Sequence, residues 1–188
     1  MTKKSALPTS AINAPAAIDL DRYVHAYFTW IANKLSRGAS QHYLNTFGVG
    51  IETWRCLVLL AQDGSMSAQY ASRVIGMDKG SISRCFKSMQ EAGLIRTKLD
   101  PNDGRARIAV LTAKGRALHD QIRGVALERE RAFLSVLQPK EIEALLGLLH
   151  RLHENLPSVE TVTQAYVSSN FSSTAKPRRS LNSDTDLL

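Results

Sequence analysis

The chain has 188 residues, of which 44% are hydrophobic and 22% are charged, as expected of a globular protein with one domain and tails. Its formal net charge of +7 favours a polyanionic partner. The sequence has neither the roughly 18-residue apolar run of a membrane-spanning helix nor the apolar core of a signal peptide. We therefore expect a cytoplasmic protein without a membrane partner.

Helical patterns occupy the first third of the chain. Residues 1–17 lack periodicity and are expected to form a flexible arm. Apolar residues recur at helical spacing over 18–46, which predicts a long helix. A second helix, over 52–62, is apolar around most of its circumference and should lie at the centre of the fold.

Two short helices with cap residues follow. Ser67 is suited to begin the first and Gly76 to end it. Asp78 is suited to begin the second, which Gly93 ends. The buried stripe of the second helix should consist of Ile82, Cys85, Phe86 and Met89.

After Gly93 the period changes to one nearer 2, which predicts strands over 94–99 and 107–112 joined by the turn sequence PNDG. Helices over 113–137 and 139–156 follow, and Pro157 is interpreted as the end of the ordered part. The predicted fold is mainly α with a small β-hairpin wing. It comprises a helix-turn-helix with a hairpin over about 51–112, flanking helices over about 18–46 and 113–156 within a domain spanning 18–156, and a mostly disordered tail over 157–188.

The exposed side of the second short helix is suited to a DNA groove. Small residues there permit close approach, and basic residues can reach guanine acceptors or phosphates, although a solvated helix face is the alternative. From Ser67 to Thr112 there are eight Lys or Arg residues against four Asp or Glu, a net charge of +4, whereas 113–156 carries only +1. The candidate residues are Lys79, Gly80, Ser81, Ser83, Arg84 and Lys87.

The hairpin carries further basic residues at its tip. Arg105 at the tip and Arg107 beside it could enter a minor groove while the helix occupies the neighbouring major groove. Asp103, two residues before Arg105, could hold its guanidinium group by a charge-assisted hydrogen bond.

The stretches DKGSISR, EAGLI, DPNDGR and LTAKG together resemble the winged helix of MarR-type transcriptional regulators. The resemblance extends from about Asp19 to Leu156, with Gly104 as a departure where the family usually has a larger residue. It implies a winged helix-turn-helix over about 51–112 and dimerisation by the helices over about 18–46 and 113–156. It further implies a DNA-binding homodimer on a pseudo-palindromic double-stranded operator, often a repressor that a small ligand releases.

Aromatic and basic residues of the first two helices suggest where such an effector binds. An aromatic stripe more often belongs to a core, yet arginines beside aromatics suit an aromatic carboxylate. The stretch IANKLSRGASQHYLNTFGVGIETWR also resembles regulators of aromatic-compound catabolism, which favours an aromatic acid or its CoA thioester. The candidate effector-binding residues are Tyr27, Trp30, Arg37, His42, Trp54 and Arg55.

Several alternatives remain open at the level of sequence. A wide apolar face on the last helix favours a partner subunit, and packing of that face against the helix over 113–137 is the alternative. For the function as a whole, an α-helical protein-interaction module without DNA binding is the competing interpretation. Cys56 and Cys85 admit a thiol sensor, although buried cysteines are usually inert. His150, His153 and Glu154 form only a partial metal-ligand set. Since no catalytic constellation or cofactor motif is present, we expect neither an enzyme nor a cofactor.

Overall fold

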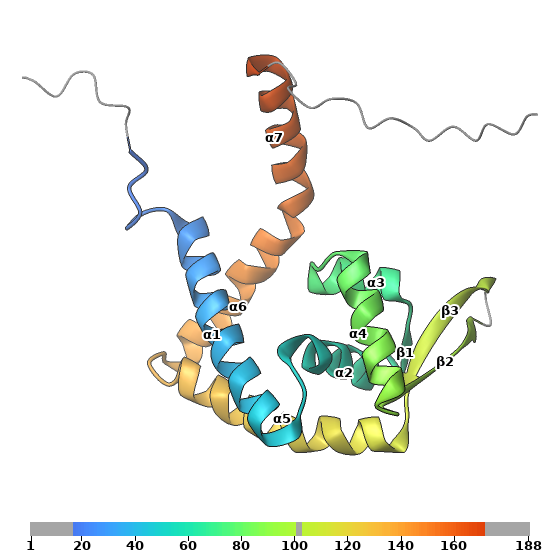
Figure 1. Ribbon diagram of the computed structural model, residues 1–188. Coiled ribbons are helices and arrows are strands. Elements are labelled where there is room, and N and C mark those ends of the chain that lie inside the picture. The colour runs from blue at the N-terminus through green and yellow to red at the C-terminus, as the bar shows by residue number, and fades with distance from the viewer. Residues whose placement is uncertain (1–16, 101–102, 172–188) are drawn as a thin grey trace, which may run out of the picture. The chain divides into compact units, whose positions relative to one another are not determined.

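Helices make up most of the residues that the computed structural model describes, 17–100 and 103–171, and a small sheet accompanies them (Figure 1). The chain divides into two compact units, residues 1–130 and 131–188. The elements in chain order are α1 (Val24–Phe47), α2 (Ile51–Asp63), β1 (Ser65–Met66), α3 (Ala68–Ile75), α4 (Lys79–Glu91), β2 (Ile95–Asp100), β3 (Asp103–Leu111), α5 (Ala113–Leu134), α6 (Pro139–Glu154) and α7 (Leu156–Asn170). The predicted fold class, mainly α with a hairpin wing, is confirmed.

The core of the first unit is built around α2. Cys56, Leu57 and Leu60 are each 0% exposed, which confirms the central place predicted for this helix. Burial on this scale is worth about 1.5–3 kcal/mol for a leucine side chain. Helix α1, by contrast, begins later than predicted because residues 19–23 form turns, with the Tyr23 N–H donating to the Leu20 carbonyl oxygen.

The caps predicted for α3 and α4 are present. Ser67 Oγ accepts a hydrogen bond from the backbone N–H of Tyr70 at 3.1 Å, and Asp78 Oδ1 accepts one from Ser81 at 2.9 Å. Each bond satisfies an amide that the first helical turn leaves without a partner. Gly76 ends α3 with φ of 74°, a conformation that costs glycine little and other residues more. Local chemistry therefore fixes the turn between the two helices.

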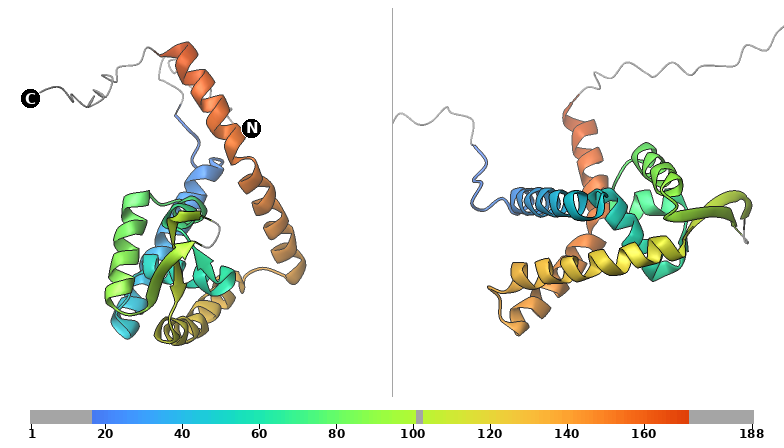
Figure 2. Two further views of the ribbon diagram at one scale, coloured as in Figure 1. Left: turned by 90° about the vertical axis from the view of Figure 1, so that its right-hand side faces the viewer. Right: turned by 60° about the horizontal axis from the view of Figure 1, so that its bottom comes forward.

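The sheet has the antiparallel order β1-β3-β2. In the hairpin Ile95 lies opposite Leu111 and Lys98 opposite Ile108. The hairpin projects beyond the helices around it, as Figure 2 shows, and Leu99 is 60% exposed. Strand β1 was not predicted, because its two residues are too few to show a period of 2. It pairs with β3 at Val110 and Ala109.

Hydrogen bonds join the residues after the wing to the turn that follows α4. Thr112 Oγ1 donates to the carbonyl oxygens of Gly93 and Leu94, at 2.7 and 3.1 Å, and accepts from the N–H of Gly115 at 3.0 Å. Lys114 Nζ donates to the Ala92 carbonyl oxygen at 2.8 Å. The stretches EAGLI and LTAKG are therefore partners in one junction, which holds α5 to the winged helix.

In the second unit, the helix predicted over 139–156 is followed by another. Helix α6 begins at Pro139, where Glu141 Oε2 accepts from the N–H of Gln138 at 2.7 Å. The prediction that order ends at Pro157 is wrong, since α7 continues to Asn170. Pro157 lies in the first turn of α7, where proline's fixed φ and missing N–H are tolerated. Residues 172–188 of the predicted tail, and 1–16 of the predicted arm, lie outside the described residues.

Candidate DNA-binding interface and effector region

Helix α4 has one buried side and one exposed side. Ile82, Phe86 and Met89 are at most 8% exposed and pack into the core. The opposite side carries the predicted DNA-contacting residues: Lys79, Gly80, Ser83, Arg84 and Lys87 are exposed and Ser81 is half-buried. Because α2 and α3 support the buried side, the polar side is presented as one surface.

Arg84 is held along its own helix. Its Nη2 donates to Ser81 Oγ at 2.8 Å, and the Ser81 hydroxyl and N–H in turn bond to Asp78 and lower the pKa of that carboxyl group. Gly80 leaves room for this arrangement, since a Cβ there would lie 3.1 Å from Asp78 Oδ1 and 3.4 Å from Arg84 Nη1. The guanidinium group is therefore partly ordered by its own helix.

Lys87 is less constrained. Its Nζ lies 3.9 Å from Glu91 Oε1, and both side chains are largely exposed, at 80% and 67%. An exposed pair of this kind contributes little to stability, about 0–1 kcal/mol. The ammonium group can therefore leave Glu91 for a phosphate at small cost.

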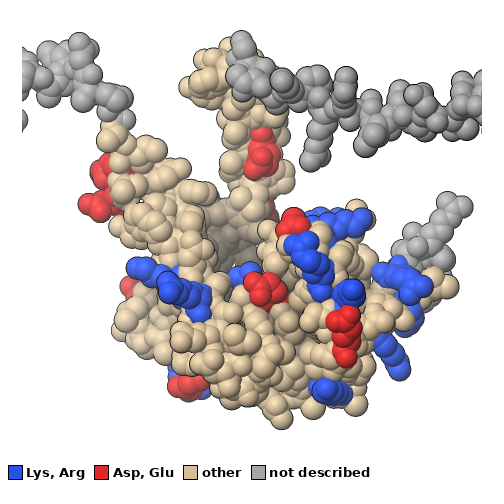
Figure 3. Space-filling model, in the orientation of Figure 1, with Lys and Arg blue, Asp and Glu red and all other residues tan. Residues whose placement is uncertain are grey.

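The polar side of α4 and the wing share a hollow of about 570 Å³. Ser83 and Lys87 line it from α4, and Arg107 and Thr97 line it from the wing. Figure 3 shows Lys and Arg side chains gathered on the side of the molecule where Figure 1 places α4 and the wing. The structure thus brings Ser83, Lys87 and Arg107 together. The side chains of residues 103–106, which include Asp103 and Arg105, lie outside the described part.

Trp54 and Arg55 of α2 line one pocket of about 390 Å³, with apolar residues of α2 and α3. Arg55 Nη2 donates to Ser36 Oγ of α1 at 2.9 Å. The Trp54 ring lies edge-on to Tyr43 of α1, with centroids 5.8 Å apart, and stacks on His119 of α5 at 5.5 Å. Arg55 and Trp54 therefore connect α2 to α1, and Trp54 also connects α2 to α5.

The other predicted effector residues do not line that pocket. Tyr27 and Trp30 contact each other, with ring centroids 5.7 Å apart, and are 44% and 43% exposed. Arg37 and His42 are exposed on α1. All four belong to α1, and the structure joins only Trp54 and Arg55 of the predicted set into one lining.

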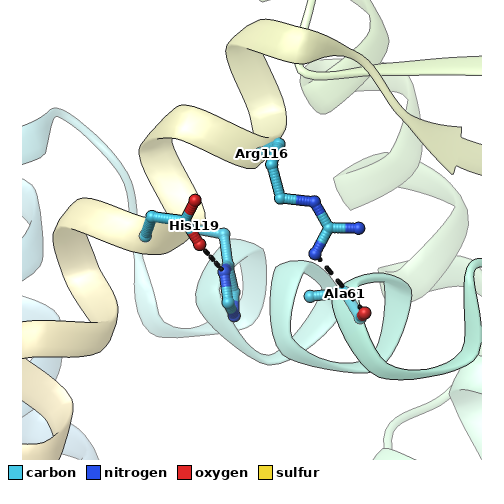
Figure 4. Close-up of polar contacts among 4 residues, drawn as sticks. Ala61, Arg116 and His119 are labelled. Carbon is cyan, nitrogen blue, oxygen red and sulfur yellow. Dashed lines mark hydrogen bonds and ion pairs between the residues drawn. The ribbon is translucent and has the colours of Figure 1, made fainter.

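A second pocket of about 390 Å³, which Trp54 also lines, lies between α2 and α5 and was not predicted from the sequence. Arg116, His119 and Arg123 line it from α5. Arg116 Nη1 donates to the Ala61 carbonyl oxygen at 3.4 Å, and His119 Nδ1 lies 2.8 Å from Asp120 Oδ1 (Figure 4). Their spacing of three and then four residues places the three on one helix face, which is the signal that could have found them.

The described part of the chain offers no group of three His, Cys, Asp or Glu side chains placed to hold a metal ion. His150, His153 and Glu154 are all exposed near the end of α6. Within the same residues, no helix combines the length and the apolar character needed to cross a membrane.

The chain is similar to known transcriptional regulators. A family model for the MarR family matches residues 47–106. The crystal structure of a MarR/EmrR family transcriptional regulator from Acinetobacter sp. ADP1 is 30% identical, with a TM-score of 0.70, over 75% of this chain and 99% of that chain. An HTH-type transcriptional repressor of Mycobacterium bovis is 27% identical over 109 residues, 56% of this chain and 78% of that protein.

The fold is also that of an Escherichia coli MarR mutant complexed with operator DNA, which is 19% identical with a TM-score of 0.61, over 70% of this chain and 94% of that chain. The fold, the exposed basic side of α4 and the similarity over nearly the full length of the Acinetobacter protein agree. The chain belongs to the MarR family and is a DNA-binding transcriptional regulator.

Proposed function

We propose that the chain is a homodimeric repressor that binds a pseudo-palindromic operator and releases it when an aromatic acid or its CoA thioester binds. The observation that carries the proposal is the division of α4 into a buried apolar side and an exposed side of small, polar and basic residues. A helix of 13 residues is about 20 Å long, enough to enter a major groove. The proposal includes no catalytic role.

Each basic residue has a distinct role in the proposed complex. Arg84, ordered by Ser81, contacts a base edge, and Gly80 and Ser83 allow the close approach that this contact needs. Lys79 and Lys87 contact phosphates. Arg107, beside the hollow that Lys87 also lines, extends the contact from α4 to the wing, and Arg105 enters the minor groove with Asp103 orienting it.

Exposed apolar side chains at both ends of the chain support a homodimer. In α1, Val24, Tyr27, Phe28 and Ile31 are each more than 40% exposed. In α6 and α7 the same holds for Leu146, Leu148, Leu152, Leu156, Val159, Val162, Tyr166 and Val167. Apolar surface of this extent is typical of an interface, and a second copy is the simplest partner that buries both regions.

The pocket beside Trp54 and Arg55 supports effector binding. Arg55 is half-buried and already bonded to α1, so its guanidinium group can take a carboxylate while Trp54 contacts an aromatic body. Arg37 is the second candidate for the carboxylate, and His42, Tyr27 and Trp30 of α1 are kept as proposed effector-binding residues although they do not line this pocket. A ligand in this pocket releases DNA by binding more tightly to a dimer conformation in which the spacing of the two winged helices does not match the operator.

The test is a DNA-binding titration of the full chain, with Arg105→Ala as the decisive variant. Fluorescence anisotropy on operator and random DNA should show a steep salt dependence for the native chain. Arg105→Ala should weaken operator binding by about 1–3 kcal/mol, the range of a lost groove contact, without loss of helical circular dichroism. Unchanged affinity would remove the minor-groove role, and salt-independent binding would favour a protein-interaction module instead.

A further inference from the structure

Helix α7 has an apolar side and a polar side, and neither is buried within the chain. The apolar side has residues at helical spacing that are each 46–67% exposed: Leu156, Val159, Val162, Tyr166 and Val167. The polar side bonds to its own helix, since Thr161 Oγ1 donates to the Pro157 carbonyl oxygen at 2.9 Å. None of the described residues from 131 to 171 is buried.

A helix of this length and composition needs support from another surface. Helix α7 has 15 residues, of which five are the β-branched Val or Thr. Isolated helices of about 12–15 residues are marginal in water even when they are rich in alanine, and β-branched residues lower helix propensity further. The stability of α7 must therefore come from packing of its apolar side.

The charge of α7 restricts what that surface can be. Glu160 is its single charged residue, and it contains neither Lys nor Arg. Binding to DNA or to an anionic membrane relies on basic residues, so α7 is suited to neither. An apolar protein surface with few charges is the chemistry that matches it.

Helix α1 offers such a surface. Residues 23–33 contain no Lys, Arg, Asp or Glu. Val24, Phe28, Ile31 and Leu35 follow one another at spacings of four, three and four residues, so they form one stripe along the helix, and each is more than a third exposed. Two apolar helix sides of this kind pack by fitting the ridges of one into the grooves of the other.

We propose that α7, an addition of this chain relative to the Acinetobacter regulator, packs against this α1 stripe of a second copy. That regulator is matched over 99% of its length by 75% of this chain, and the quarter that remains exceeds residues 1–16 and 172–188 together. Helix α7 follows α6 directly through Asn155, so it continues the proposed dimer surface. The inference rests on the proposed homodimer and adds two symmetric helix pairs to it.

The first test is the strength of the dimer, measured by sedimentation on the full-length chain. Complete burial of one valine side chain favours association about tenfold or more, and a charge buried in its place opposes association further. Val162→Glu should therefore raise the dimer dissociation constant about tenfold or more. Gln164→Glu is the matched control, because it adds the same charge to the polar side of α7, where Gln164 bonds to Ser168. Its dissociation constant should stay near native.

The second test identifies the surface that α7 meets and keeps an aromatic group on the apolar side. A full-length chain with Tyr166→p-benzoylphenylalanine is irradiated in an equal mixture of unlabelled and isotope-labelled chains after subunit exchange. Mass spectrometry should find cross-linked peptides of mixed isotope content that join position 166 to residues 23–35. Links within one chain, or links to another segment of the second copy, would overturn the proposal.

The two proposals fail in different ways. A native chain that sediments as a monomer at micromolar concentration would contradict the homodimer and the role of α7 together. A native homodimer in which Val162→Glu and Gln164→Glu dissociate alike would overturn only the packing of α7 on α1 and leave the homodimer intact.

Discussion

Arg84 and Lys87 lie one turn apart on α4 but differ in their surroundings. Arg84 is ordered by Ser81 at 2.8 Å, whereas Lys87 meets only an exposed carboxylate at 3.9 Å. We expect Arg84→Ala to cost about 1–3 kcal/mol on operator and little on random DNA. Lys87→Ala should weaken both alike and lower the salt slope by roughly 1.

The control for these two variants is Lys34→Ala on α1, which removes the same charge from an exposed position outside α4 and the wing. Its affinity should stay close to native. Equal losses on operator and random DNA for Arg84→Ala would make that residue a phosphate contact instead.

The acidity of Cys85 gives a prediction that needs no DNA. A pKa lowered from 9.0 to about 7 means that the thiolate forms as pH rises through 7. The rate of alkylation by iodoacetamide should therefore reach half its maximum near pH 7. In Cys56→Ala, which lacks the donor, the half-maximum should move to higher pH. The groups that face Cys85 are Cys56, Thr53 and Met89, with Glu52 nearby opposing ionisation. A native midpoint near 9 would show that Cys56 does not lower the pKa of Cys85.

At the scale of elements, the junction between the wing and α5 leaves no space at Gly115. A Cβ there would clash with the carbonyl oxygen of Leu94, which also accepts a hydrogen bond from Thr112. We expect Gly115→Ala to destabilise the fold by about 1–3 kcal/mol, the cost of overpacking. Thermal or urea unfolding would measure it.

Gly124 of the same helix is the matched control. A Cβ at Gly124 meets nothing within 4 Å, so Gly124→Ala should be neutral or stabilise by up to about 1 kcal/mol through helix propensity. Equal effects of the two substitutions would show that the junction is not tightly packed.

How much of the fold the sequence predicts depends on whether the deciding interaction is local. Ser67, Asp78 and Gly76 act on amides within their own turns, so the limits of α3 and α4 could be predicted. Helix α7 could not, because Pro157 is equally compatible with a stop and with a first turn. Strand β1 forms through pairing with β3, and the partners Ser65 and Val110 are 45 residues apart in sequence, so no local pattern contains this interaction.

The residues of the candidate site can be divided in the same way, into those that local spacing predicts and those that only tertiary packing brings together. The exposed side of α4 follows from helical spacing, so its residues could be named from sequence. The contact of Cys56 with Cys85 and the stacking of Trp54 on His119 join separate helices, and their proximity is set by tertiary packing. Arg116, His119 and Arg123 were missed for the same reason: spacing shows one helix face but not the α2 residues that it meets.

At the scale of the whole molecule, α2 is the element through which an effector could act on DNA binding. It is bonded to α1 through Arg55 and Ser36, stacks on α5 through Trp54 and His119, and touches α4 through Cys56 and Cys85. A ligand beside Trp54 therefore has a direct packing route to the recognition helix. Binding to operator half-sites one helical turn apart requires the two α4 helices of a dimer to lie about 34 Å apart. A small tilt of each winged helix is therefore enough to break the contact with one half-site.

We accordingly expect Arg55→Ala to keep operator affinity near native and to abolish release by an aromatic acid or CoA thioester, because the carboxylate partner is lost while α4 is untouched. Isothermal calorimetry with a panel of such acids, followed by anisotropy on operator with saturating ligand, would measure both. Arg123→Ala is the matched comparison, since Arg123 lines the second pocket, to which Trp54 also contributes. Loss of release in Arg123→Ala alone would move the effector to the groove between α2 and α5. If no acid binds below roughly millimolar, equivalent to about 4 kcal/mol, the aromatic effector is excluded and the DNA-binding assignment is unaffected.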